Sequence, residues 1–367
     1  MARNIIKSNN AIVATQDSTA AWSYNQEDLV IFKLAQNFEY SIGFPNQSAK
    51  QLGVQSFAYQ EMISQPDVSL NLSYIPEPNF SNEERGRFLN NTFDWTGGFK
   101  NLFDSPEGAD SNNFYVLVEE NQGVDFLDTV DFAVWLNLSG ADAIAFGNCY
   151  PTSYNLNYAV GTFPVVSTSY ICSNVVFDPL TGRSMESPAI NLTGGNNDGG
   201  GRINFEFQKD LSTAALEKTP PVVNPTDSNS SITLENLQVG GQNLSGIHLV
   251  QSVDMGVTLS RVSSYGLGND YAYDRKAQFP AQGSFNVSSL VSGMESGSMT
   301  GVLNNNEDYS FELVLASGSL KMVYQIEGAK LNSMSYTMPV NDLMTFDASF
   351  DFEVTQTKGL KISGTSY

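Results

Sequence analysis

The stretch Phe346-Asp-Ala-Ser-Phe-Asp-Phe-Glu-Val354 alternates apolar and polar residues at every position. Successive side chains of a β-strand point to opposite faces, so the aromatic residues would share one face and Asp347, Asp351 and Glu353 the other. One buried face and one solvated face are typical of a strand in an antiparallel sheet. We therefore predict a half-buried antiparallel strand over these residues.

The same period of two recurs along the chain, whereas the period of an amphipathic helix is scarce. A mainly β fold with little helix follows from this pattern. Two short helices are expected, at Asn82 to Asn91, with Ser81 as N-cap and Glu84 three residues on, and at Leu211 to Lys218. Further alternating strands are predicted at Phe32 to Ile42, Val68 to Tyr74, Leu249 to Leu259 and Leu320 to Ile326.

A chain of 367 residues exceeds the roughly 250 to 300 at which single cores divide, so we expect two domains. Dense Gly, Pro and Asn between Asp178 and Gly241 indicate a connection. Pro76 to Asn113 is a second irregular stretch. The predicted organisation is an N-terminal arm (1–27), a first domain (28–177) with an insertion near 76–113, a connecting region (178–246) and a second domain (247–367).

The two halves carry similar landmarks in the same order, which indicates an internal repeat. Ser153-Tyr154 and Ser169-Tyr170 in the first half correspond to Ser335-Tyr336 and Ser349-Phe350 in the second. The serines are 16 and 14 positions apart, respectively. Single dipeptides recur by chance in a chain rich in Ser and Tyr, but the common order favours duplication. The earlier landmarks are Leu52-Gly53, Pro66 and Ser69 to Ser73, matched by Leu267-Gly268, Pro280 and Ser284 to Ser288.

The charge excludes a basic nucleic-acid binder. The chain has 39 acidic against 18 Lys and Arg residues, a formal net charge of -21, and no basic cluster to neutralise phosphates. No apolar run is long enough for a membrane span, and the first residues lack the apolar core of a signal peptide, so we expect synthesis inside a cell and no membrane insertion. Cys149 and Cys172 are expected to be small buried hydrophobic residues.

No arrangement of residues points to catalysis. His248 is the one histidine, too few for a zinc site or for an imidazole-activated nucleophile with supporting groups. Phosphate-binding Gly motifs and the spaced acids of a calcium loop are absent, and no spacing singles out a carboxylate pair. We predict no enzyme activity, no cofactor and no metal.

The layout of each half resembles the tail tube, or major tail, proteins of long-tailed bacteriophages. The resemblance covers about residues 28–177 and 247–367, and it is one of pattern and order rather than of a diagnostic motif. Two copies in one chain, and the insertion in the first, depart from the simplest family pattern. The residues that carry it are Leu52-Gly53, Pro66 and Gly147 to Tyr154, then Leu267-Gly268, Pro280 and Gly328 to Tyr336.

The resemblance implies tandem antiparallel β-sandwich or barrel domains that close into rings of six domains. The stacked rings would form a channel through which DNA passes during genome delivery, without specific binding. Two domains per chain imply a homotrimer with a pseudo-hexameric ring. The implied partners are further copies of the chain, the tape-measure, tail terminator and tail tip proteins, and a sheath protein where the tail contracts. The implied location is the virion tail, assembled in the host bacterial cytoplasm.

Two long loops, Phe44 to Gln65 and Arg261 to Phe279, resemble segments that bridge neighbouring subunits in this family. Both contain large apolar residues in a polar setting, which is typical of an interface. Folding back onto their own domain is the alternative. The predicted interface residues are Leu52, Val54, Phe57, Tyr59 and Met62 in the first loop, and Tyr265, Leu267, Tyr271 and Tyr273 in the second.

An acidic channel wall would repel phosphates, so Asp347, Asp351 and Glu353 are candidates for the lumen face. The alternative is that they form the outer, solvated face of an antiparallel sheet. Two other functions stay open. One is a carbohydrate-binding or adhesive virion protein with Trp22, Trp95 or Trp135 as sugar platforms, and the other is a glycosidase-like enzyme.

Overall fold

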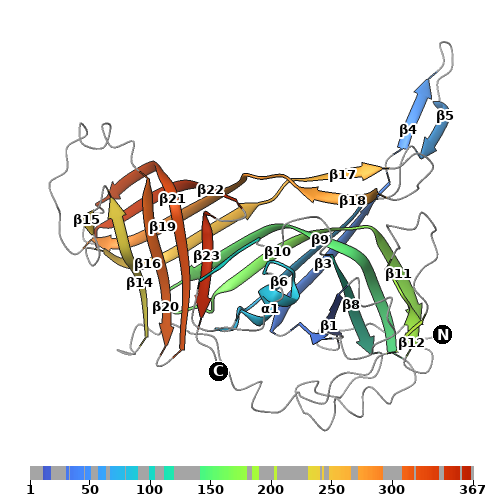
Figure 1. Cartoon of the computed structure of the whole chain (residues 1–367), viewed down its shortest axis with the longest axis horizontal. Coiled ribbons are helices and arrows are strands. Elements are labelled where there is room, and N and C mark those ends of the chain that lie inside the picture. The colour runs from blue at the N-terminus through green and yellow to red at the C-terminus, as the bar shows by residue number, and fades with distance from the viewer. Residues whose placement is uncertain are drawn as a thin grey trace, which may run out of the picture.

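A computed structural model gives the fold as mainly β and antiparallel, which confirms the predicted class. Within its described residues the strands of each half are arranged in two sheets that pack face to face (Figure 1). The structure describes residues 11–17, 30–32, 34–44, 46–50, 57–62, 67–78, 80–89, 99–103, 111–119, 141–179, 184–189, 202–204, 230–239, 242–243, 248–265, 272–291, 308–317, 320–338, 343–355 and 358–364.

The central feature is a continuous antiparallel sheet of eight strands, four from each half of the chain. The first half means the described residues of 11–179, and the second half those of 230–364. In spatial order the strands are β3 (Ala35–Gly43), β6 (Asp67–Tyr74), β10 (Val165–Cys172), β9 (Ala141–Ala159), β16 (His248–Thr258), β19 (Ala281–Val291), β22 (Thr345–Val354) and β21 (Leu320–Thr337).

Two further sheets cover one face of this central sheet. The long strands β9 and β21 run from the central sheet into them, so each half is a sandwich held at one corner by a shared strand. In the first half the covering strands are β2 (Val30–Ile31), β1 (Ala11–Asp17), β8 (Asn112–Glu119), β9 and β11 (Asn174–Pro179). In the second half they are β15 (Gln242–Asn243), β14 (Ser230–Val239), β20 (Tyr309–Ser317), β21 and β23 (Leu360–Gly364). β7 (Lys100–Asn101), from the first half, pairs with β23 and extends this sheet.

The two halves repeat one topology, β1-β8-β9-β11 matching β14-β20-β21-β23. Their bulges also recur. The equivalent strands β3 and β16 each have one extra residue, Gln36 and Gln251 respectively. The equivalent strands β9 and β21 also have one each, Thr152 and Asn332. β1 lies within the predicted N-terminal arm and β14 within the predicted connecting region. The domain boundaries themselves stay a prediction.

The bulges correct the alignment of the repeat. Ser153 pairs with Ser169, and the residue that pairs with Ser349 is Ser333, not Ser335. The two Ser-Tyr dipeptides are therefore two positions out of register. Matching dipeptides misplace the alignment because the structurally equivalent core-side positions, Tyr154 and Met334, need only be large and apolar and need not be the same residue.

Several other elements differ from the expected ones. The first alternating strand begins at Ala35, because Leu34 has a φ of 52° and interrupts it. The first helix, α1 (Ser81–Arg85), is shorter than predicted and is followed by Arg87 at φ 60°. Ser81 is its first residue and donates its hydroxyl to Glu77. The second predicted helix, at Leu211 to Lys218, lies outside the described residues.

Both predicted long loops contain antiparallel hairpins. The first contains β4 (Asn46–Lys50) and β5 (Phe57–Met62), and the second contains β17 (Arg261–Tyr265) and β18 (Ala272–Ala277). The β4–β5 hairpin projects from the body of the molecule, and β17–β18 lies at the same end (Figure 1). A further small pair joins β12 (Ser184–Glu186) and β13 (Arg202–Asn204).

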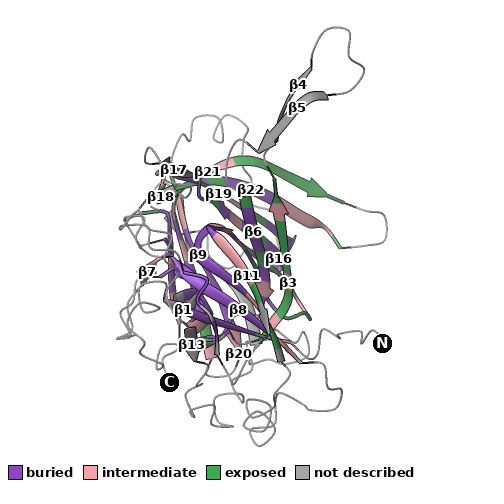
Figure 2. Ribbon diagram, turned by 90° about the vertical axis from the view of Figure 1, so that its right-hand side faces the viewer, coloured by how far each residue is buried: buried purple, intermediate pink, exposed green. Residues whose placement is uncertain are grey.

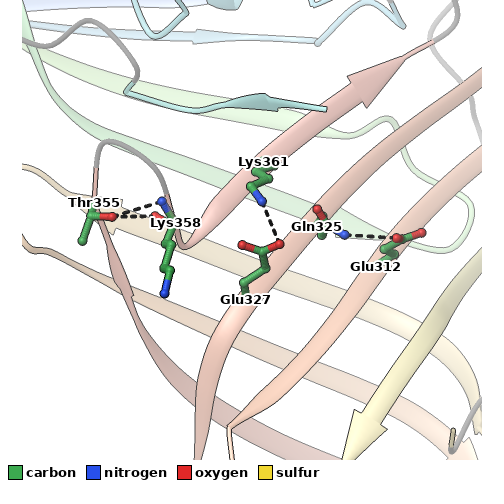
Figure 3. Close-up of polar contacts among 6 residues, drawn as sticks. All are labelled: Glu312, Gln325, Glu327, Thr355, Lys358 and Lys361. Carbon is green, nitrogen blue, oxygen red and sulfur yellow. Dashed lines mark hydrogen bonds and ion pairs between the residues drawn. The ribbon is translucent and has the colours of Figure 1, made fainter. Parts of the chain in front are cut away.

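Polar contacts tie the strands of the second covering sheet. Lys361 of β23 forms an ion pair with Glu327 of β21 at 2.7 Å, and Gln325 of β21 donates to Glu312 of β20 at 3.3 Å (Figure 3). The turn from β22 to β23 is closed by the Lys358 amide, which donates to the hydroxyl of Thr355 at 3.0 Å. The polar contacts between strands lie on the outer side of the sheet, and most apolar residues of the same strands face the core on the other side.

Candidate assembly edges and polar face

The two halves meet where β9 pairs with β16. On the core side of this junction Tyr154 lies opposite Val257, and Leu156 lies opposite Met255. All four side chains are fully buried. The sheet therefore continues from one half to the other, with its backbone hydrogen bonds formed and its apolar face buried.

The two outer edges of the central sheet, β3 and the last part of β21, lack this cover. Among the described residues, β3 pairs only with β6, and β21 from Lys330 onward pairs only with β22. Figure 2 shows exposed residues along β3, whereas the strands at the junction carry many buried ones. Unpaired edges of this kind are templates for pairing with another chain.

Apolar side chains follow both edges on the core side. On β21, Met334 is 46% exposed, and Tyr336 and Met338 next to it are also exposed. On β3, Tyr40 is 38% exposed, and Phe44 directly after the strand is 62% exposed. Tyr40 contacts the rings of Phe146 and Phe177, at 5.3 and 6.3 Å between centroids, and Phe177 is itself exposed.

The repeat relates these exposed residues to buried ones. By the shared bulges, Met334, Tyr336 and Met338 of β21 are equivalent to Tyr154, Leu156 and Tyr158 of β9. Likewise Phe38, Tyr40 and Ile42 of β3 are equivalent to Val253, Met255 and Val257 of β16. The β9 and β16 positions are buried at the internal junction. Each half therefore presents one edge of each kind, and within the described residues one edge of each kind stays unpaired.

The opposite face of the central sheet is polar. Asp347, Asp351 and Glu353 lie on this face of β22, as the alternation predicts, and Asp351 and Glu353 are exposed. Most of the neighbouring positions are Ser, Asn or Gln, and a shallow hollow in the second half is lined by Ser252, Asp254, Asn286, Ser288, Ser335 and Asp347. These residues have no regular spacing in sequence and come together only through the register of four strands.

Carboxylates dominate this polar face. Asp347, Asp351 and Glu353 are joined there by Asp254 of β16 and, in the first half, by Glu39 and Asp67. Lys330 is the one cation on this face within the described strands. It lies opposite Asp351 and forms an exposed ion pair with Asp308 at 3.5 Å. The face can repel phosphates but has no cluster of cations to hold them.

The predicted loop residues divide between the hairpins and parts outside the described residues. Phe57, Tyr59 and Met62 lie on β5, Tyr265 on β17 and Tyr273 on β18, while the contacts of their side chains are not described. Leu52, Val54, Leu267 and Tyr271 lie outside the described residues, and so do Trp22, Trp95 and Trp135. Their proposed roles stay predictions.

Sequence reasoning missed the edge residues Tyr40, Met334 and Met338 as a site. Alternation shows which face of a strand is apolar, but it does not show which strand lacks a neighbour. The available signal was the repeat itself, since one equivalent strand pair is used internally. A search of the described residues also finds no group of three or more potential metal ligands, and no helix with the length and hydropathy of a membrane crossing.

Comparisons with known proteins leave the family open. No family model matches the chain, and no curated protein matches it. Among solved structures it is similar to a chain described as "Virion of native gene transfer agent (GTA) particle", with a TM-score of 0.23 and 10% identity. That match covers 37% of this chain and 96% of the other. A likeness at this level carries no argument about function.

Proposed function

We propose that this chain is a structural virion protein whose copies join edge to edge into closed rings of a bacteriophage tail tube. The observation that carries the proposal is the internal β9–β16 junction. It is a working example of the contact that the unused edges β21 and β3 would make between two chains. The resemblance of each half to tail tube proteins supports the same assignment.

The contact would be head to tail, because β21 of one chain has to meet β3 of the next. Head-to-tail contacts generate rings when the rotation closes and filaments when it does not. Burial of the exposed apolar edge residues would contribute about 25 cal/mol for each Å² of apolar surface removed from water. It would also pair the backbone groups of both edges, which satisfies donors and acceptors that otherwise face solvent.

The internal junction specifies the register of the proposed contact. Leu156 pairs with Met255 and Asn155 with Gly256 at the junction. Transferred through the repeat, Tyr336 would lie opposite Tyr40 of the next chain, and Ser335 opposite Ser41. A defined register is what allows the proposal to be tested at single residues.

The polar face of the central sheet would line the channel. In a ring every copy presents the same face to the inside, so the carboxylates of β22 would recur around the wall. Their repulsion of phosphates, with Ser and Asn side chains between them, would let DNA pass without a binding site that holds it. The candidate lumen residues remain Asp347, Asp351 and Glu353.

The proposed ring contains three chains, since each supplies two tube-like halves to a pseudo-hexameric arrangement. The hairpins β4–β5 and β17–β18, at one end of the molecule, are placed to contact a neighbouring chain or ring. Tape-measure, terminator and tip proteins, and a sheath where the tail contracts, complete the proposed set of partners.

Negative-stain electron microscopy of the purified chain at increasing concentration, with mass photometry of the same samples, tests this function. Three-chain rings or hollow filaments are expected. Rings of six chains would keep the tube and overturn the stoichiometry. A chain that stays monomeric at its highest soluble concentration would contradict assembly through its own edges.

A further inference from the structure

A buried carboxyl group lies between the two halves of the chain. Glu83, on α1, is 0% exposed. Its Oε1 accepts hydrogen bonds from the hydroxyls of Tyr74 at 3.1 Å and Tyr154 at 3.2 Å. Its Oε2 is buried and has no partner among the described residues. Only one of the two carboxyl oxygens of this buried acid therefore accepts hydrogen bonds from the described residues.

The second half closes the cluster around Glu83. The hydroxyl of Tyr324, on β21, lies 3.3 Å from that of Tyr154, and the ring of Phe80 meets Tyr324 edge-on at 5.4 Å between centroids. Tyr74 and Tyr154 come from the first half. The carboxyl group therefore sits where a proton can influence contacts between the halves.

The segment that carries Glu83 also binds the second half directly. The described residues of 77–103, called here the bridging segment, lie within the predicted insertion. The amide of Leu102 donates to the carbonyl of Leu360 at 2.9 Å, and β7 pairs with β23. At Gly364 an added Cβ would lie 1.9 Å from the Pro78 carbonyl oxygen, which shows how closely the segment is packed.

Among the described side chains, those that interact with Glu83 are neutral or acidic, and the buried Arg87, four residues on, donates its Nε to Asn112 at 3.1 Å. Tyr74 of β6, Tyr154 of β9, Tyr170 of β10 and Tyr324 of β21 have pKa values raised above the usual range, chiefly by burial, so they stay protonated at neutral pH. The carboxylate of Glu77 adds repulsion. Glu83 makes no ion pair with a described residue. Burial, first, and Glu77 raise the pKa of Glu83 to about 7, while hydrogen bonds from its own backbone amide and from Tyr74 and Tyr154 oppose the shift.

We infer that Glu83 is a proton-controlled lock between the two halves: the neutral carboxyl keeps the bridging segment docked on β21 and β23, and its ionisation loosens this docking. An ionised carboxylate in this cluster would be buried beside Glu77 with no ion-pair partner among the described side chains, which is costly unless water reaches it. The least expensive route for water is separation of the bridging segment from the second half. The inference concerns the single chain and does not depend on ring formation.

Hydrogen exchange measured by mass spectrometry tests the lock. After correction for the intrinsic effect of pH, peptides covering residues 100–103 and 360–364 of the wild-type chain should exchange at least several-fold faster at pH 8.5 than at pH 6. Glu83→Gln keeps the size and removes the charge, so its peptides should stay protected at both pH values. Asp142→Asn, at an exposed carboxylate of β9, is the matched control and should behave as wild type.

A second variant keeps the test decisive if Glu83→Gln does not fold. Tyr74→Phe removes a donor to the carboxylate, which disfavours the charged form, so the change in protection should move to higher pH. Equal protection of the wild-type peptides at pH 6 and 8.5 would overturn the inference. So would a pH-dependent loss of protection that persists unchanged in Glu83→Gln.

Discussion

The carbonyl oxygen of Pro78, in the first half, occupies the place where a side chain on Gly364, in the second, would begin: a Cβ there would lie 1.9 Å away. The bridging segment is therefore packed against β23 at backbone distance. This contact makes the predicted insertion a structural part of the connection between the halves.

Replacement of Gly364 should test how much that packing contributes. Gly364→Ala forces the Pro78 backbone or β23 to move, and overpacking of this kind costs about 1 to 3 kcal/mol. The free energy of unfolding, measured in urea, should fall by this amount. The control is Gly43→Ala, where the nearest atom to the new Cβ is 3.8 Å away. Equal effects of the two substitutions would contradict the assigned contact.

The stability of the chain should depend on pH through Glu83. The pKa of its carboxyl is raised from 4.5 to about 7 in the folded state, so the folded state binds the proton more strongly than the unfolded state does. The contribution of this group to stability is therefore fully present below pH 4.5 and is lost as pH rises to about 7. A shift of this size corresponds to about 3 kcal/mol.

Urea denaturation of wild type and Glu83→Gln across pH 5 to 8 measures this dependence. The difference between the variant and wild type should grow with pH in favour of the variant and level off above pH 7. A difference that is constant with pH would show that Glu83 does not titrate in this range.

The exposed apolar residues of β21 should matter far more for assembly than for the stability of the single chain. Tyr336→Asp places a charge in the proposed contact with Tyr40 of the next chain and should prevent rings and filaments. Tyr336 is 45% exposed, and its ring meets that of Phe346 at 5.0 Å between centroids, so the free energy of unfolding of the chain should fall by only about 1 kcal/mol. Asn155→Asp adds the same charge to the polar face of the central sheet but on β9, away from both outer edges, and rings should still form, as seen by electron microscopy.

Reversal of charge on the polar face should create DNA affinity. The double variant Asp351→Lys with Glu353→Lys changes two exposed carboxylates of β22 into cations. Two new phosphate contacts should give double-stranded DNA binding with a logarithmic salt slope of about -2. Asp142→Lys with Glu312→Lys changes the net charge equally but on the covering sheets, away from this face. Fluorescence anisotropy should detect binding only for the first pair, and equal binding would count against the assigned channel wall.

The mainly β fold class could be predicted from the sequence, because the alternation of apolar and polar residues reflects directly which side of a strand is buried. Phe346 to Val354 shows this best, since its apolar residues face the core and its acids the polar face. Repetition of the fold was also readable from ordered landmarks. The exact residue equivalence was not, because it is defined by strand register and by the matching bulges at Thr152 and Asn332, and Met334 fills the place of Tyr154 with a different side chain.

The features that connect the two halves could not be predicted from the sequence. Glu83 lies in a helical, charged stretch that indicates a solvated surface, and its burial depends on Tyr324, far away in sequence. Pairing of β9 with β16 likewise joins edges that no local pattern marks. Strand pairing between distant segments is decided by the whole fold, so neither the internal junction nor the unused edges can be read from periodicity.

Disulfide cross-linking across the proposed contact tests the central claim most directly. Because Cys149 and Cys172 are buried, cysteines introduced as Ser41→Cys and Ser335→Cys would be the accessible thiols in the described part of the chain. Under mild oxidation the double variant should form covalent dimers and trimers on a non-reducing gel, with a trimer closed into a ring as the end product, while each single variant should yield no ladder of linked chains. Efficient assembly without this cross-link would contradict the β21–β3 contact, and with it the account of how the chain forms a tube.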